Sequence, residues 1–219
     1  MNFVDDVVRI ESGRAVLDAD LRVPQRAAGL VIFAHGSGSG RFSPRNRAVA
    51  GVLETEGFAT LLADLLTREE EAVDQYTRQH RFDIGLLGRR VVDAVDWAQA
   101  QPELRSLPVA TFGASTGAAA ALIAAAERPK LVRAVISRGG RPDLADEALE
   151  RVQAPTLLIV GGADDVVIEL NQEAARRMRA PVQLEIVPGA THLFEEPGTL
   201  EQVARLAAEW CTKHLKRQP

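Results

Sequence analysis

Short apolar runs recur along the chain, and each is typical of a strand buried on both faces of a sheet. Leu30–Ala34 is the clearest, because all of its positions are apolar. Val182–Val187 alternates between apolar and polar positions, so we expect it nearer an edge of the sheet. The remaining strands of this kind are expected at Ala59–Ala63 and at residues 109–112, 132–136 and 156–160.

Amphipathic stretches lie between these runs and predict helices. In residues 82–100, the apolar side chains Ile84, Leu87, Val91 and Val95 recur at spacings of three and four, which places them on one helical face. An acidic run at residues 69–71 is interpreted as the solvated start of a further helix. The other helices are expected at residues 45–56, 116–127, 144–152, 170–178 and 199–214.

The order of these elements indicates the fold. Strands that alternate with helices imply right-handed crossovers and a mostly parallel sheet. Residues 7–10 and 15–23 are also strand-like, and Ser12 and Gly13 separate them, so we expect an N-terminal antiparallel hairpin. The sequence has no linker, repeat or low-complexity segment. We therefore predict an α/β fold in a single domain over residues 1–219, with helices on both faces of a mostly parallel central sheet.

The composition argues against several classes of partner. The net charge is −4 at pH 7, and basic residues cluster only at Lys213, Lys216 and Arg217, which leaves no electrostatic footprint for nucleic acid. No segment approaches the ~20 consecutive apolar residues of a membrane span. Residues 1–6 lack an apolar core of signal-peptide length, so we expect a cytoplasmic protein. The single cysteine, Cys211, is expected to be buried in the C-terminal helix.

The pentapeptide Gly113-Ala114-Ser115-Thr116-Gly117 is the most informative motif. It follows an expected strand and opens an alanine-rich helix, which is the context of a nucleophile elbow. Such a turn holds its serine at a positive φ and crowds the residues two positions away on either side. Glycine at 113 and 117 is therefore a steric requirement. The structural alternative is an ordinary strand-to-helix turn built from small residues.

A serine hydroxyl is a poor nucleophile until a histidine accepts its proton. His192 follows the strand Val182–Val187, so it is expected at the sheet edge where ligands meet an open α/β fold. The other histidines fit less well, because His35 lies in a glycine-rich loop, His80 precedes a helix and His214 lies within one. We therefore predict that His192 is the general base.

The histidine in turn needs a carboxylate that fixes its tautomer and stabilises the imidazolium. Asp164 and Asp165 both follow the strand expected at residues 156–160, and spacing alone leaves either possible. Asp143 follows an earlier strand and is less favoured. An acid at this place completes the chain order Ser, Asp, His, which is the order that this kind of elbow uses.

A glycine-rich loop, His35-Gly36-Ser37-Gly38-Ser39-Gly40, directly follows the strand Leu30–Ala34. The oxyanion that develops in acyl transfer needs backbone N–H donors. We expect one donor from Thr116, at a helix N-terminus, and the second from Ser37. A phosphate-cradling loop is the weaker interpretation, because the loop lacks both the Gly-Lys-Ser/Thr ending and the GxGxxG spacing. The sequence carries no pair with zinc-ligand spacing and no signal of a cofactor or of an oligomeric state.

These motifs resemble those of the α/β-hydrolase superfamily, and specifically its dienelactone-hydrolase-like branch, from about residue 30 onward. The resemblance rests on His35-Gly36-Ser37, the elbow, residues 161–167 and Thr191-His192. In that family the acid commonly sits three residues after a glycine that ends the strand. Here that glycine is Gly161, so the resemblance implies Asp164 as the acid. Residues 43–46 and 137–143 are similar to those of one uncharacterised subgroup of the branch.

Two departures from relatives bear on the substrate. Dienelactone hydrolases proper use cysteine as the nucleophile, whereas this chain has Ser115, which favours ordinary carboxylic esters over a dienelactone. Many relatives carry a cap domain between the two strands that follow the elbow. Here only 19 residues, Ser137 to Pro155, separate those strands, which leaves room for one helix and no lid.

We therefore expect a lidless serine esterase that cleaves small carboxylic esters. One alternative is hydrolysis of another acyl bond, in a small amide, a peptide or a lactone. The other is a binding protein without turnover, because a fold does not by itself establish a function. All three predict a small-molecule partner.

Arg138 is a candidate for substrate binding, because it follows the strand expected at residues 132–136 and should emerge beside the elbow. A guanidinium there can hold a substrate carboxylate in a bidentate fork. Arg41 and Arg45 are expected to add to a positive rim. The structural alternative is a salt bridge from Arg138 or Arg141 to Asp143 or Asp146.

Overall fold

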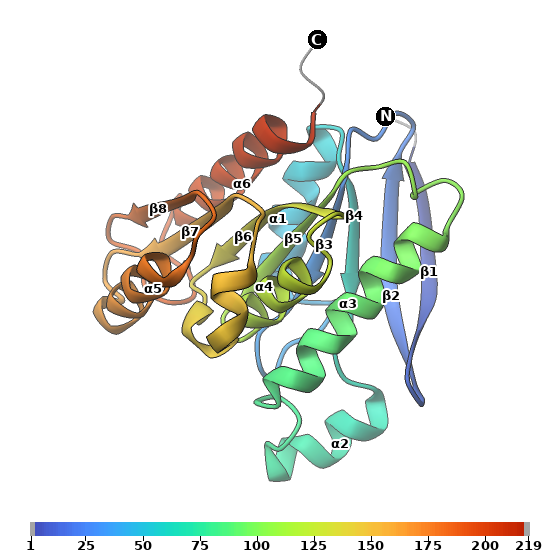
Figure 1. Ribbon diagram of the computed structural model, residues 1–219, viewed down its shortest axis with the longest axis horizontal. Coiled ribbons are helices and arrows are strands. Elements are labelled where there is room, and N and C mark those ends of the chain that lie inside the picture. Colours follow the sequence, from blue (N-terminus) through green and yellow to red (C-terminus); the bar gives the residue numbers. More distant parts are fainter. Residues whose placement is uncertain (1–2, 217–219) are drawn as a thin grey trace.

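The structure is a computed structural model that describes residues 3–216. In these residues, eight strands form one sheet in the order β1-β2-β4-β3-β5-β6-β7-β8 (Figure 1). β1 pairs antiparallel with β2, and β2 pairs antiparallel with β4, whereas all later neighbours are parallel. The predicted hairpin and mostly parallel sheet are confirmed. The strands are β1 (Phe3–Ser12), β2 (Ala15–Pro24), β3 (Leu30–Ala34), β4 (Ala59–Ala63), β5 (Val109–Ala114), β6 (Val132–Arg138), β7 (Thr156–Gly161) and β8 (Val182–Val187).

Helices cover both faces of the sheet, as predicted (Figure 1). Alternate residues of one strand point to opposite faces, so Ile32 packs in the core on one side and Phe33 packs in the core on the other. Phe33 stacks against Phe112, with ring centroids 4.7 Å apart. The face of Ile32 is covered by α3 (Ile84–Ala100), α4 (Gly117–Glu127), η1 (Pro142–Arg151, a 3₁₀-helix) and α5 (Asp165–Arg177), and that of Phe33 by α1 (Pro44–Thr55) and α6 (Thr199–Leu215).

The acidic run at residues 69–71 lies in the first turn of a helix, α2 (Arg68–Thr77), as expected. Its side chains are mostly exposed, so it lacks the apolar stripe by which helices are recognised. A capping box stabilises its start, in which the Thr67 hydroxyl accepts from the Glu70 backbone and the Glu70 carboxylate accepts from the Thr67 backbone. Arg90 of α3 forms an ion pair with Glu70 at 2.6 Å and so ties α2 to the body of the protein.

Two other elements are shifted. The helix expected at residues 144–152 is a 3₁₀-helix with a break at Asp146, where φ is 46°. The helix expected to begin near residue 170 begins at Asp165, directly after the loop that follows β7.

Cys211 is fully buried in α6, as expected, and burial raises the pKa of its thiol to about 12. No helix in residues 3–216 is long and apolar enough to cross a bilayer. The same residues contain no group of three or more His, Cys, Asp or Glu side chains that could hold a metal ion.

Candidate active site

Ser115 lies at the apex of a sharp turn between β5 and α4, with φ at 52°. The predicted strand–turn–helix and its positive φ are therefore present. A Cβ atom on Gly113 would lie 2.3 Å from the Cα of Ala118, and one on Gly117 would lie 2.2 Å from the carbonyl oxygen of Ala34. Both contacts are with backbone that cannot move aside, so the turn requires glycine at each position.

His192 and Asp164 reach this turn from the loops after β8 and β7. The Nδ1 atom of His192 lies 2.7 Å from Oδ2 of Asp164, and its Nε2 atom lies 3.4 Å from Oγ of Ser115. The first distance is that of a strong hydrogen bond, whereas the second is long, as is common in unliganded sites. Asp165 instead begins α5 and is exposed. The structure thus brings together Ser115, Asp164 and His192, and it leaves Asp165 outside this group.

The two loops are held together at the end of β7. A Cβ atom on Gly161 would lie 2.4 Å from the carbonyl oxygen of Ala190 and 2.6 Å from that of Thr191. The Thr191 hydroxyl and backbone N–H both bind the carboxylate of Glu196, which closes the histidine loop on itself. The side chain of His192 is 37% exposed and that of Asp164 is 17% exposed, so the pair lies open to solvent on one side.

His35 is buried, and its ring connects two loops. Its Nε2 atom accepts a hydrogen bond from the backbone N–H of Leu65 at 2.8 Å, so Nδ1 carries the proton and donates to the carbonyl of Gly36 at 2.9 Å. Burial lowers the pKa of His35, which keeps the ring neutral. The loop after β3 is thereby tied to the loop after β4.

The glycine-rich loop lies against the elbow. A Cβ atom on Gly36 would lie 3.0 Å from the Cβ of Ser115. Within residues 3–216, the backbone N–H groups of Ser37 and Thr116 donate to no other protein group. Thr116 also immediately precedes α4, where the helix dipole favours negative charge. Both predicted oxyanion donors therefore have no acceptor among the described residues.

A cavity of about 250 Å³ opens beside this loop. Its first wall is residues 35–39, and its second wall comes from α2 and the start of α3. The second wall is polar, because Arg81 forms an ion pair with the buried carboxylate of Asp74. Sequence reasoning missed this wall. The Thr-x-x-Glu capping signature at Thr67 was the available signal for it.

Comparisons with known proteins identify the family. A model of the dienelactone hydrolase family matches residues 17–216. The chain belongs to this family. A crystal structure of dienelactone hydrolase from Anabaena variabilis ATCC 29413 is 55% identical and superimposes with a TM-score of 0.96, covering 98% of this chain and 99% of that one. Est1E from Butyrivibrio proteoclasticus, solved with ferulic acid, has a TM-score of 0.80 over 94% of this chain and 98% of its own, but at 18% identity it shows the fold alone.

One curated relative has a different name. A Mycobacterium tuberculosis (strain ATCC 25618 / H37Rv) protein described as "Putative phosphoribosyl transferase" is 58% identical over 211 residues. The match covers 96% of this chain but 47% of the relative, so the chain spans about half the length of that protein. Membership in the dienelactone hydrolase family supports hydrolase activity for the matched part.

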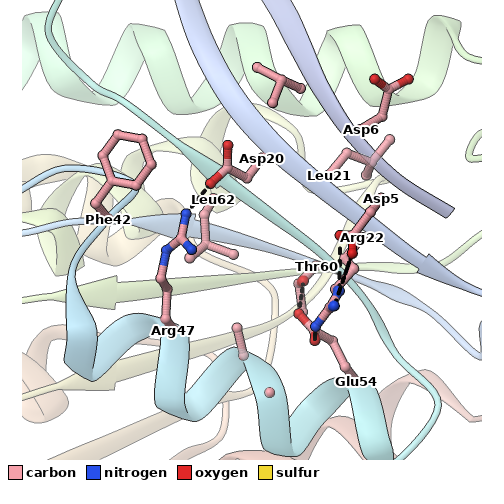
Figure 2. A pocket seen from close by; sticks show the side chains of 13 residues that line it. Asp5, Asp6, Asp20, Leu21, Arg22, Phe42, Arg47, Glu54, Thr60 and Leu62 are labelled. Atoms are coloured by element: carbon pink, nitrogen blue, oxygen red, sulfur yellow. Dashed lines mark hydrogen bonds and ion pairs between the residues drawn. The ribbon is translucent and has the colours of Figure 1, made fainter. Parts of the chain in front are cut away.

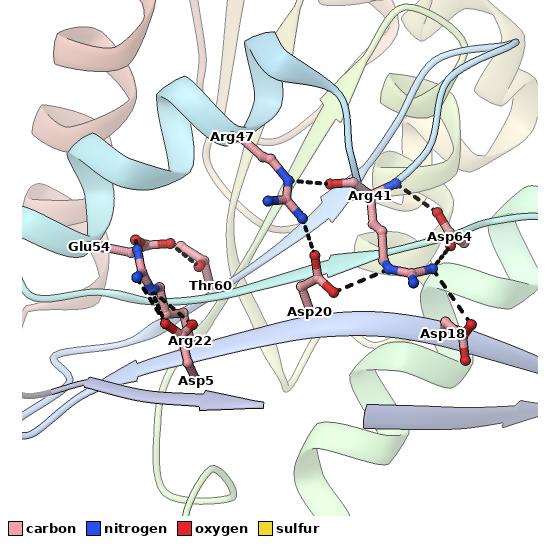
Figure 3. A network of polar contacts seen from close by, with 9 residues as sticks. All are labelled: Asp5, Asp18, Asp20, Arg22, Arg41, Arg47, Glu54, Thr60 and Asp64. Carbon is pink, nitrogen blue, oxygen red and sulfur yellow. Dashed lines mark hydrogen bonds and ion pairs between the residues drawn. The ribbon is translucent and has the colours of Figure 1, made fainter. Parts of the chain in front are cut away.

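Three of the arginines near the site differ in their environments. Arg141 forms an ion pair with Asp143 at 2.7 Å, which matches the structural alternative predicted for it. Arg45 contacts Glu195 at 3.2 Å, three residues after His192. Arg41 is buried and forms ion pairs with three carboxylates, so the prediction that it adds to a positive rim is wrong (Figure 3). Those carboxylates belong to Asp18, Asp20 and Asp64.

Arg138 ends β6, beside the elbow, and its carbonyl accepts the backbone N–H of Ser115 at 3.3 Å. It is 6% exposed, and it forms no ion pair with a carboxylate of residues 3–216. One hydrogen bond runs from Nη2 to Oδ1 of Asn46 at 3.3 Å, and the buried Nε has no partner in this part of the chain. Burial, together with the nearby charge of Arg45, lowers the pKa of Arg138 to about 10.

Proposed function

We propose that this protein is a serine hydrolase that cleaves small carboxylic esters through an acyl-enzyme intermediate. The observation that carries the proposal is the position of His192, whose two ring nitrogens lie 2.7 Å from Asp164 and 3.4 Å from Ser115. Family membership supports the hydrolase class, and this contact supports the serine mechanism.

The first half-reaction follows from the hydrogen bonds. Nδ1–H of His192 donates to Asp164, which leaves the lone pair of Nε2 directed at Ser115. Nε2 takes the hydroxyl proton while Oγ forms a bond to the ester carbonyl carbon. The carbonyl oxygen becomes an anion that the backbone N–H groups of Ser37 and Thr116 stabilise.

The intermediate then collapses. The C–O bond to the alcohol breaks, and the imidazolium of His192 returns its proton to the departing oxygen. Water repeats the sequence against the acyl group on Ser115, with the same base and the same N–H donors. The acid is released and the serine hydroxyl is regenerated.

The surroundings of the triad suggest which esters fit. The cavity of about 250 Å³ beside the oxyanion loop accommodates a small group, and its Arg81–Asp74 wall favours a polar one. On the other side of the elbow, Arg138 is a buried cation without a carboxylate partner in residues 3–216. We assign it to binding a carboxylate of the substrate, because an unpaired buried charge is stabilised by an anion.

The decisive experiment combines labelling with turnover. We expect a fluorophosphonate to modify Ser115, and a panel of para-nitrophenyl esters of increasing acyl length to be hydrolysed. Ser115→Ala should abolish labelling and lower kcat by about 10⁴-fold or more. Ser106→Ala, at an exposed serine, is the matched control and should retain both.

An adduct that maps to Ser37 or Ser137 would refute the elbow assignment. Inactivity across the ester panel with labelling retained would favour a different acyl bond, such as that of an amide or a lactone. Inactivity without labelling would favour a binding protein.

A further inference from the structure

β1 is an outer strand with one free edge. Within residues 3–216 it pairs with β2 alone. It runs for ten residues without proline or lysine, and its pairing with β2 has no register shift. Val4 and Val7 are 63% and 64% exposed. Long regular edges of this kind are templates for pairing with another strand.

The turn after β1 determines which backbone groups face outward. Ser12 and Ala15 flank the two-residue turn of Gly13 and Arg14, and such a turn is closed by a hydrogen bond between its first and fourth residues. Bonded and outward positions alternate along an antiparallel strand. The even-numbered residues of β1 therefore bond to β2, and the N–H and C=O groups of Asp5, Val7 and Arg9 point away from the sheet.

The side chains of these outward residues lie on the face of the sheet that carries α1. Asp5 and Val7 border a groove of about 680 Å³ between the hairpin and α1, together with Phe42 and Arg47 (Figure 2). The Asp5 carboxylate forms an ion pair with Arg22 of β2 at 2.9 Å and is still 64% exposed. The side chain of Arg9 is 81% exposed, and among residues 3–216 it approaches Asp18 at 3.8 Å. The edge thus offers an apolar centre flanked by one acidic and one basic side chain, each largely exposed.

We propose that β1 pairs antiparallel with β1 of a second copy of this chain, about a two-fold axis at Val7. This axis places Val7 opposite Val7, and Asp5 opposite Arg9 at both ends. Opposite charges across a strand pair stabilise it, and like charges destabilise it. The two sheets then form one continuous sheet through the dimer.

The neighbouring axes in the centre of the strand give poorer pairings. An axis at Asp5, Asp6 or Arg9 places like charges opposite each other. An axis at Val8 sets Asp5 against Glu11. Among the axes at residues 5–9, the axis at Val7 is the one that brings no like charges together, so the charges in the centre of the strand favour this register.

The experiment is sedimentation velocity of the full chain at protein concentrations of about 1 to 100 µM, which lie at and above the µM dissociation constants of the weaker specific interfaces. The chain has a mass of 23.7 kDa, and we expect the wild type to sediment as a dimer of about twice that mass. Val7→Lys places two ammonium groups at the axis and should produce the monomer. Val16→Lys is the matched control, because Val16 is 50% exposed on neighbouring β2, and it should remain dimeric.

Amide hydrogen exchange supplies a second readout that identifies the edge. In the wild type, the amides of Asp5, Val7 and Arg9 should be protected, and in Val7→Lys they should exchange at least tenfold faster. A wild type that is monomeric throughout the range would overturn the proposal. So would a dimer that survives Val7→Lys, or one whose outward β1 amides exchange freely.

Discussion

Replacement of Arg138 by leucine separates a substrate-binding role from a structural one. If Arg138 holds a substrate carboxylate, the variant loses a charged hydrogen bond, which contributes about 1.5–3 kcal/mol. KM for an ester that carries a carboxylate should then rise roughly 10- to 100-fold. KM for a neutral ester of similar size should not change, because that substrate makes no contact with the guanidinium.

The second part of this prediction concerns the thermal stability of Arg138→Leu. Arg138 is 6% exposed, and burial and Arg45 lower its pKa from the usual arginine range to about 10. That shift corresponds to a cost of about 3 kcal/mol for keeping the charge in the unliganded protein. The hydrogen bond to Asn46, at 3.3 Å, offsets only part of it. Leucine removes both, so Tm of Arg138→Leu should be equal to or above that of the wild type.

The assay compares para-nitrophenyl pentanoate, whose acyl group has the same number of carbons, with the mono-para-nitrophenyl ester of glutaric acid, and scanning calorimetry gives Tm. Arg141→Leu is the matched control, since Arg141 is paired with Asp143 and both esters should be hydrolysed as in the wild type. The reasoning is refuted if Arg138→Leu weakens both esters equally and lowers Tm, because the guanidinium would then be a structural group.

Two further predictions concern the histidines and their partners. Asp164→Asn should lower kcat by about 10⁴-fold in steady-state assays, because the amide no longer selects the working tautomer of His192. Asp165→Asn should have little effect on kcat, and equal losses in the two variants would contradict the geometry. The pKa of His35 is lowered by burial, so the unfolded chain binds the proton more tightly, and stability should fall as pH drops below about 6.5, by up to roughly 1.4 kcal/mol per pH unit. Urea unfolding at several pH values should show that this slope is reduced in His35→Gln, and an unchanged slope would show that another group causes it.

The sheet and the placement of Ser115 and His192 could be predicted because their signals are local. A strand buried on both faces is apolar throughout, and a nucleophile elbow needs glycine at 113 and 117 whatever surrounds it. Asp164 could be preferred over Asp165 only through the family resemblance, because adjacent residues share every feature of spacing. The structure separates them, since only Asp164 contacts His192.

The misjudged features depend on distant partners. Arg41 was expected at the rim, but it is buried against Asp18, Asp20 and Asp64, which lie on other strands or loops (Figure 3). No local pattern indicates such a set of ion pairs. The start of α2 was expected, but its extent was not, for a related reason: its ion pair with Arg90 and its capping box stabilise it without an apolar face.

The strand order has a consequence for folding kinetics. β5, which carries Ser115, lies between β3 and β6, and Leu30 of β3 pairs with Val109 some 79 positions later. Closing so long a loop is slow, and the hairpin β1–β2 can form long before it. Since His192 reaches the elbow only when β6, β7 and β8 have added in turn, a reactive Ser115 marks a sheet that is complete from β3 to β8. The rate at which a refolding sample gains fluorophosphonate reactivity therefore measures the last step of assembly.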